Sequence, residues 1–123
     1  MEKLQNYIGG KWVDSHSSET SHVLNPANQE ILALVPSGNY QDVQQAAEAA
    51  QKGFQEWRNT PVSKRVQYLF KLKTILEDNT DDIARTITLE SGKTFLEAKA
   101  EMVRAIENVE NACGMPTLMQ GEF

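Results

Sequence analysis

The sequence predicts a mainly α-helical segment with about four helices, preceded by a β-hairpin segment. Two observations support this prediction. The spacing of apolar residues changes from about 2 before Asn39 to about 3.6 after it, as expected where strands give way to helices. In addition, one stretch between Thr94 and Gly114 carries both a start and a stop signal for a helix.

Residues 1–38 carry the β signals. The pair Gly9-Gly10 lies in the middle of the stretch 7–13, which favours a short strand pair or a bent strand because glycine readily adopts positive φ. A second extended stretch covers residues 23–35 and has a turn in its middle. We therefore expect a β-hairpin segment over residues 1–38.

The first three predicted helices have recognisable starts. Asn39 caps the first and has Asp42 at the capping-box position. Pro61 opens the second, where its missing N–H costs least, and Asn79 or Thr80 caps a short third. The residues that share one face are Val43, Ala46, Ala47, Ala50, Phe54 and Trp57 in the first helix; those of the broad buried side are Val66, Leu69, Phe70, Leu72, Lys73 and Leu76 in the second; and Ile83 and Ile87 face inward in the third.

The fourth helix is the most clearly marked. Thr94 and Glu97 have the spacing of a capping box, and Gly114 followed by Pro116 marks the stop. One stripe at helical spacing is expected to face inward. Its residues are Phe95, Ala98, Met102, Ala105, Ile106, Val109, Ala112 and Cys113.

The expected organisation of residues 1–123 is a β-hairpin segment (1–38), a helical layer (39–114) and an exit (115–123) toward a remainder outside this sequence. Several helical stripes are wide and rich in alanine, which favours packing against a large flat neighbour such as a sheet. Without that neighbour, the apolar faces would drive self-association.

Composition excludes some classes of function. The net charge is −5, which argues against nucleic acid as a partner, because such binding relies on Lys and Arg. No stretch approaches the roughly 20 apolar residues that span a bilayer, and none resembles a signal peptide, so no membrane partner and a cytoplasmic location are expected. Cys113, the single cysteine, lies on an apolar stripe and is interpreted as a small hydrophobic residue.

The sequence predicts no catalytic, cofactor-binding or metal-binding residue in this chain. His16 and His22 lie in a polar loop without clustered metal ligands. The stretch 91–94 resembles the end of a phosphate-binding loop, but Ile87 stands where that motif needs its first glycine. Glutamate pairs at helical spacing, Glu97 with Glu101 and Glu107 with Glu110, are expected to be solvated.

Arg104 is the polar residue that the sequence singles out. It lies roughly 150° from the centre of the fourth helix's apolar stripe, so its side chain is predicted to be exposed. One interpretation is an ion pair with Glu101 or Glu107 on the same helix. The other is that Arg104 binds a substrate carboxylate, for which a guanidinium is well suited.

The chain resembles the N-terminal quarter of an aldehyde dehydrogenase. The resemblance rests on motifs in order along the sequence: residues 7–13 (YIGGKWV), 25–27 (NPA), 35–36 (VP), 46–50 (AAEAA) with Phe54 and Trp57, and 88–94 (TLESGKT). Within that superfamily, residues 97–110 and 112–121 are most similar to the methylmalonate-semialdehyde dehydrogenases.

That resemblance implies an α/β fold of Rossmann type, in which residues 1–123 form the N-terminal part of the cofactor-binding domain. It implies NAD-dependent oxidation of a small-molecule semialdehyde through a cysteine thioester, with CoA as acyl acceptor, in a homo-oligomer. The arginine that matches Arg104 would bind the substrate carboxylate. Ala105 departs from the subgroup, which usually has glycine after this arginine.

The residues themselves leave two alternatives open. One is a hydrolytic aldehyde dehydrogenase, such as a succinate-semialdehyde type. The other is a non-enzymatic helical interaction module. In either case the 123 residues alone are expected to be inactive and to hold no bound cofactor, because the family's nucleophilic cysteine and its oxyanion-stabilising asparagine have no match among them.

Overall fold

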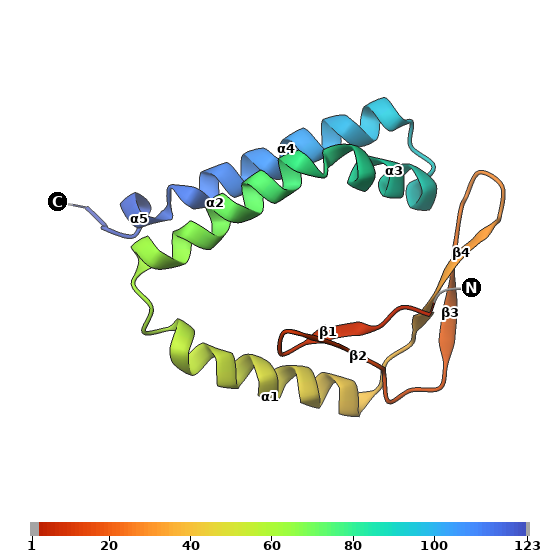
Figure 1. The fold of residues 1–123 in the computed structure, drawn as a ribbon, viewed down its shortest axis with the longest axis horizontal. Coiled ribbons are helices and arrows are strands. Elements are labelled where there is room, and N and C mark those ends of the chain that lie inside the picture. The colour runs from red at the N-terminus through yellow and green to blue at the C-terminus, as the bar shows by residue number, and fades with distance from the viewer. Residues whose placement is uncertain (1–2, 123) are drawn as a thin grey trace. The chain divides into compact units, whose positions relative to one another are not determined.

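A computed structural model describes residues 3–122 of the chain, which divides into two compact units (Figure 1). The first unit ends at Asn59 and the second begins at Thr60. The first helix lies in the first unit, together with the β-hairpins.

The first hairpin of the first unit forms around the glycine pair, as the sequence predicts. Strand β1 (Asn6–Ile8) pairs antiparallel with β2 (Lys11–Val13). Gly9 and Gly10 have φ of 60° and 79°, the left-handed values that a tight two-residue hairpin turn needs. The rings of Tyr7 and Trp12, which are register partners, meet edge to face with centroids 5.0 Å apart.

A second hairpin joins β3 (Thr20–Leu24) to β4 (Ile31–Pro36), also antiparallel. Its turn is organised by the buried Asn25, whose Oδ1 accepts a hydrogen bond of 2.9 Å from the backbone N–H of Ala27. The sequence predicted the extended stretches, and the structure adds their pairing with each other.

Helix α1 (Tyr40–Trp57) follows the second hairpin and has the predicted capping box. The Asn39 side chain accepts from the N–H of Asp42, and the Asp42 side chain accepts from the N–H of Asn39. The buried and partly buried positions of α1 are Asp42, Gln45 and Ala49. The predicted apolar stripe of α1 lies on exposed positions instead.

The second unit is a group of helices joined by short turns. It contains α2 (Val62–Asp78), α3 (Thr80–Ser91), α4 (Phe95–Cys113) and α5 (Met115–Leu118). Helices α2 and α4 run side by side in opposite directions, and α3 packs on the N-terminal part of α4 (Figure 1). The core contains the buried residues Val66, Ala84, Ala98 and Met102, with Leu76, Ile83 and Ile87 packed around the last three.

Several details of the second unit differ from the sequence prediction. Phe70 and Leu72 of α2 are exposed at 48% and 41%, although both were expected on its buried side. Phe95 and Ala105 of α4 are also exposed, although both were expected on the stripe that faces inward. Helix α5 was not predicted. Gly114 does end α4, but it has a right-handed helical conformation (φ −81°), so the chain continues directly into another helical turn.

None of the helices within residues 3–122 combines the length and the apolar character that crossing a bilayer requires. A line of exposed apolar residues lies instead along α1. Its residues recur at spacings of three and four, which places them in one line along the helix. They are Tyr40, Val43, Ala47, Ala50, Phe54 and Trp57, here called the α1 stripe.

We expect the 123-residue chain, when isolated, to associate with itself through the α1 stripe, since apolar faces of this kind favour contact with each other. Sedimentation velocity over a wide concentration range should show dimers or larger species. Val43→Glu with Phe54→Glu, which places two charges on the stripe, should shift the chain toward monomer. A monomer at every concentration in the unaltered chain would contradict this expectation.

Candidate functional site

The corner between α3 and α4 fixes the start of the helix that carries Arg104. Gly92 caps α3 in a left-handed conformation (φ 74°), and Thr94 two residues later caps α4. The Thr94 hydroxyl accepts from the N–H of Glu97, and the Glu97 side chain accepts from the N–H of Thr94. This is a helix-to-helix corner, so residues 91–94 do not form a phosphate-binding loop between a strand and a helix.

Lys93 lies within this corner and reaches along α4. Its Nζ donates to Oε2 of Glu101, in an ion pair with both side chains partly exposed. Lys93, and more weakly Arg104, hold the pKa of Glu101 below its ordinary value. Glu101 is therefore a stable carboxylate that already has a partner.

Arg104 is exposed on α4, as its angle from the apolar stripe predicts. Its backbone carbonyl accepts from Nδ2 of Asn108 at 3.1 Å. Within residues 3–122, no carboxylate forms an ion pair with its guanidinium. The pair with Glu101 or Glu107 that the sequence offered is thus not formed, and the guanidinium can receive an anion from outside.

Ala105, the departure from the subgroup pattern, is also exposed. Its methyl group therefore does not disturb the packing of α4 within the second unit.

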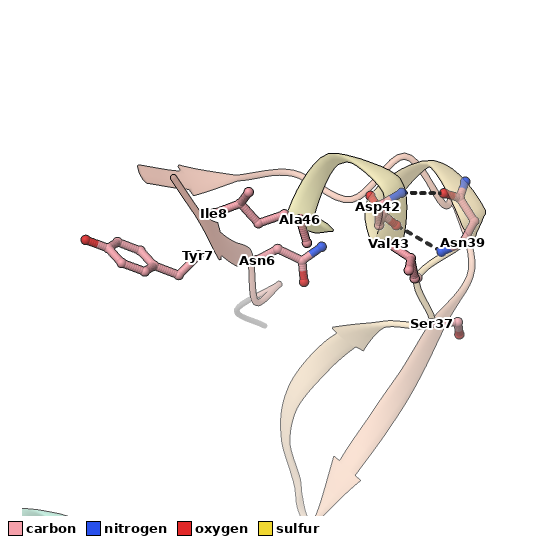
Figure 2. A pocket seen from close by; sticks show the side chains of 9 residues that line it. Asn6, Tyr7, Ile8, Ser37, Asn39, Asp42, Val43 and Ala46 are labelled. Carbon is pink, nitrogen blue, oxygen red and sulfur yellow. Dashed lines mark hydrogen bonds between the residues drawn. The ribbon is translucent and has the colours of Figure 1, made fainter. Parts of the chain in front are cut away.

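A hollow of about 510 Å³ lies in the first unit, between β1 and the start of α1 (Figure 2). Ile8 points toward Ala46 on one side of it, and the capping pair Asn39 and Asp42 forms another side. The remaining residues around the hollow are Asn6, Tyr7, Ser37, Gly38 and Val43.

Asp42 is the one acidic group of this hollow, and its hydrogen bonds are directed into the protein. Asp42 is 6% exposed, and its carboxylate accepts from the Ser15 hydroxyl (2.6 Å) and the His16 N–H (2.9 Å). It also accepts from the N–H of Asn39 (3.0 Å), and Nδ1 of His16 lies 2.9 Å away. These contacts, led by the one with Ser15, hold the pKa of Asp42 well below its ordinary value.

Such a carboxylate is a structural anchor and not a proton-transfer group. A general base works best with a pKa near the working pH, whereas Asp42 stays ionised far below it. Its role is to tie residues 15–16 to the N-terminus of α1, where a negative charge also suits the helix dipole.

His16 has a structural contact that the sequence did not predict. Its ring contacts Asp42 across 26 residues of sequence. Local sequence patterns do not predict the contact between His16 and Asp42, because the residues around Asp42 indicate only its capping role.

Acid is expected to weaken the first unit through Asp42. Because folding lowers its pKa below the ordinary value near 3.8, its contribution to stability is complete above about pH 4 and is lost as the pH falls further. Asp42→Asn should lower the unfolding temperature near neutral pH by about 5 °C, as expected for weakening a capping box. It should also flatten the decline below pH 4. Asp82→Asn, at an exposed aspartate, is the control; equal pH profiles in the two variants would contradict this assignment.

The other candidate groups have no reactive arrangement. Glu97 belongs to the capping box, and Glu110 lies 3.4 Å from the Lys73 ammonium. Cys113 is partly buried on α4. In the part of the chain that the structure describes, no three residues of the kinds that bind metals gather at one place.

The two helices with capping boxes, α1 and α4, do not offer a free N-terminus to a dinucleotide. A pyrophosphate commonly binds at a helix N-terminus behind a glycine-rich turn. The N-termini of α1 and α4 are instead occupied by the carboxylates of Asp42 and Glu97.

The fold and sequence together define a class. A model of the aldehyde dehydrogenase family matches residues 12–123, and the chain belongs to that family. Among curated relatives, it is 46% identical over 122 residues to a malonate-semialdehyde dehydrogenase of Bacillus pumilus. That match covers 99% of this chain and 25% of the relative, so the chain spans about a quarter of such a protein's length.

Solved structures agree with this class. The methylmalonate-semialdehyde dehydrogenase of Oceanimonas doudoroffii superposes with a TM-score of 0.94 at 41% identity, over 99% of this chain and 25% of that one. A Sinorhizobium meliloti protein described as a methylmalonate-semialdehyde dehydrogenase, in complex with NAD, gives 0.94 at 32% identity, over 100% and 25%. The α/β fold class expected from the resemblance is thus confirmed by the family match and these neighbours.

Proposed function

We propose that these residues form the N-terminal part of an NAD-dependent semialdehyde dehydrogenase whose substrate carries a carboxylate. Malonate semialdehyde and methylmalonate semialdehyde are the two candidates, because relatives of both kinds match nearly the whole chain. The observation that supports a carboxylated substrate is the exposed guanidinium of Arg104, which has no carboxylate partner among residues 3–122.

Arg104 is proposed to bind the substrate carboxylate. A guanidinium presents a planar fork of N–H donors that matches a carboxylate in both geometry and charge. Two such hydrogen bonds would hold one end of the substrate and so orient the aldehyde at the other end.

The remaining chemistry is proposed for residues outside this sequence. The aldehyde would be oxidised through a thioester on a cysteine, with NAD as oxidant and CoA as acyl acceptor. Cys113, partly buried on α4, is not assigned as that cysteine. The 123 residues alone are proposed to be inactive, and the working protein is proposed to be a cytoplasmic homo-oligomer.

The test uses the full-length protein with malonate semialdehyde or methylmalonate semialdehyde and NAD, with and without CoA. NADH formation, followed by absorbance, is expected with both substrates, and mass spectrometry should find an acyl-CoA product when CoA is present. Free acid as the sole product would support the hydrolytic alternative. Absence of NADH formation with either semialdehyde would contradict the proposal.

A further inference from the structure

The ion pair between Lys93 and Glu101 lies next to Arg104 along the chain. Glu101 precedes Arg104 by three residues on α4, and side chains at this spacing are neighbours on a helix surface. Arg104 also contributes to the electrostatic environment of Glu101. Glu101 is therefore an internal carboxylate within the reach of the group proposed to bind a substrate carboxylate.

Glu101 is also the stronger of the two possible competitors on α4. An acid that precedes its basic partner along a helix pairs better than an acid that follows it. Glu101 precedes Arg104, whereas Glu107 follows it. Nevertheless, Glu101 is paired with Lys93 in the structure and not with Arg104.

The fold directs Lys93 to Glu101. The left-handed Gly92 turns the chain, and the capped Thr94 fixes the residue after Lys93 at the start of α4. The nearer acidic residue, Glu97, accepts hydrogen bonds from both the backbone N–H and the hydroxyl of Thr94. Lys93 thus reaches past Glu97 to the next acidic residue along the helix.

We propose that Lys93 is a positioning residue for substrate binding: by holding Glu101, it keeps the Arg104 guanidinium available for the carboxylate of the substrate. This inference rests on the proposed function of Arg104. Without Lys93, Glu101 would pair with Arg104, and an incoming carboxylate would have to displace it.

The expected effect is modest and selective. An ion pair at this spacing on an exposed helix face is weak, so its competition should raise KM for a carboxylated aldehyde by about two- to threefold. The kcat for that substrate should stay the same, because saturating substrate displaces Glu101. KM for propanal should not change, because propanal has no carboxylate.

The test measures KM and kcat of the full-length protein for malonate semialdehyde and for propanal. K93M should show the two- to threefold rise for malonate semialdehyde alone. E101Q should behave like the unaltered protein, and K93M/E101Q should return to it, because the competing carboxylate is gone. K93R, which keeps a positive charge at position 93, should have the same KM for malonate semialdehyde as the unaltered protein.

Lys99→Met is the matched control. It removes a lysine from the same helix, but Lys99 pairs with Asp81 at 2.8 Å and not with Glu101. An equal rise of KM in K99M and K93M would show a general loss of positive charge and overturn the inference. Failure of K93M/E101Q to restore KM would overturn it as well. If K93M gives little folded protein, K93Q takes its place with the same expectations.

The two levels of the proposal fail in different ways. If the unaltered protein and Arg104→Ala both treat malonate semialdehyde and propanal alike, the proposed function of Arg104 fails. If Arg104→Ala is selective while K93M leaves KM for malonate semialdehyde unchanged, only the role of Lys93 fails.

Discussion

Arg104→Ala in the full-length protein is expected to raise KM for malonate semialdehyde by about 10- to 100-fold, the range that corresponds to losing hydrogen bonds between charged groups. Alanine cannot form hydrogen bonds with the substrate carboxylate, and no other basic residue of α4 occupies this place on the helix surface. KM for propanal should rise far less. The measurement is steady-state NADH formation with both aldehydes at saturating NAD.

Two controls separate specific binding from loss of charge or fold. Arg104→Lys keeps the charge but lacks the planar fork, so it should fall between alanine and the unaltered protein. Arg85→Ala removes another exposed arginine of the second unit, one that pairs with Asp82. It should leave the ratio of the two KM values unchanged. Equal effects of Arg104→Ala on both aldehydes would remove Arg104 from substrate recognition.

The largest expected effect on stability comes from Met102→Ala. Met102 is 4% exposed and packs with the fully buried Ala84 and Ala98, where α3 meets α4. Truncating a buried methionine leaves a cavity and typically costs about 2–5 kcal/mol. The core around it is small, so we expect a substantial fall in the free energy of unfolding of the second unit.

Met115→Ala is the matched control for this prediction. Met115 opens α5 and is 40% exposed, so its truncation should change stability by no more than about 0.5 kcal/mol. Urea unfolding followed by circular dichroism compares the two variants with the unaltered protein. Equal midpoints for Met102→Ala and Met115→Ala would show that the second unit does not depend on this core.

Features specified by local sequence were predictable. The capping boxes at Asn39 and Thr94 and the glycine turn at Gly9-Gly10 are each set by residues within a few positions of one another. The exposure of Arg104 followed from the helical period alone.

Features that depend on distant partners were not predictable. Phe70 and Leu72 lie on a wide apolar arc of α2, and periodicity cannot say which part of such an arc α4 covers. The contacts of Ser15 and His16 with Asp42 join residues far apart in sequence. In the sequence, Lys93 belonged only to the apparent end of a phosphate-binding loop. Its pairing with Glu101 depends on the corner between α3 and α4, which the sequence did not predict.

The proposed role of Arg104 was not predictable from its position on the helix alone. An exposed arginine on a helix is usually one half of a surface ion pair, and the sequence offered Glu101 and Glu107 as partners. The structure shows Glu101 engaged by Lys93 instead. The functional interpretation therefore combines that unoccupied guanidinium with the family to which the chain belongs.

The central claim is that the protein selects aldehydes by a carboxylate. The most direct test is competition, in which the full-length protein receives equal concentrations of malonate semialdehyde and propanal with limiting NAD. Mass spectrometry then quantifies the products derived from each aldehyde. Products of malonate semialdehyde are expected to dominate in the unaltered protein and to lose most of that advantage in Arg104→Ala. Equal consumption of the two aldehydes by the unaltered protein would contradict the claim.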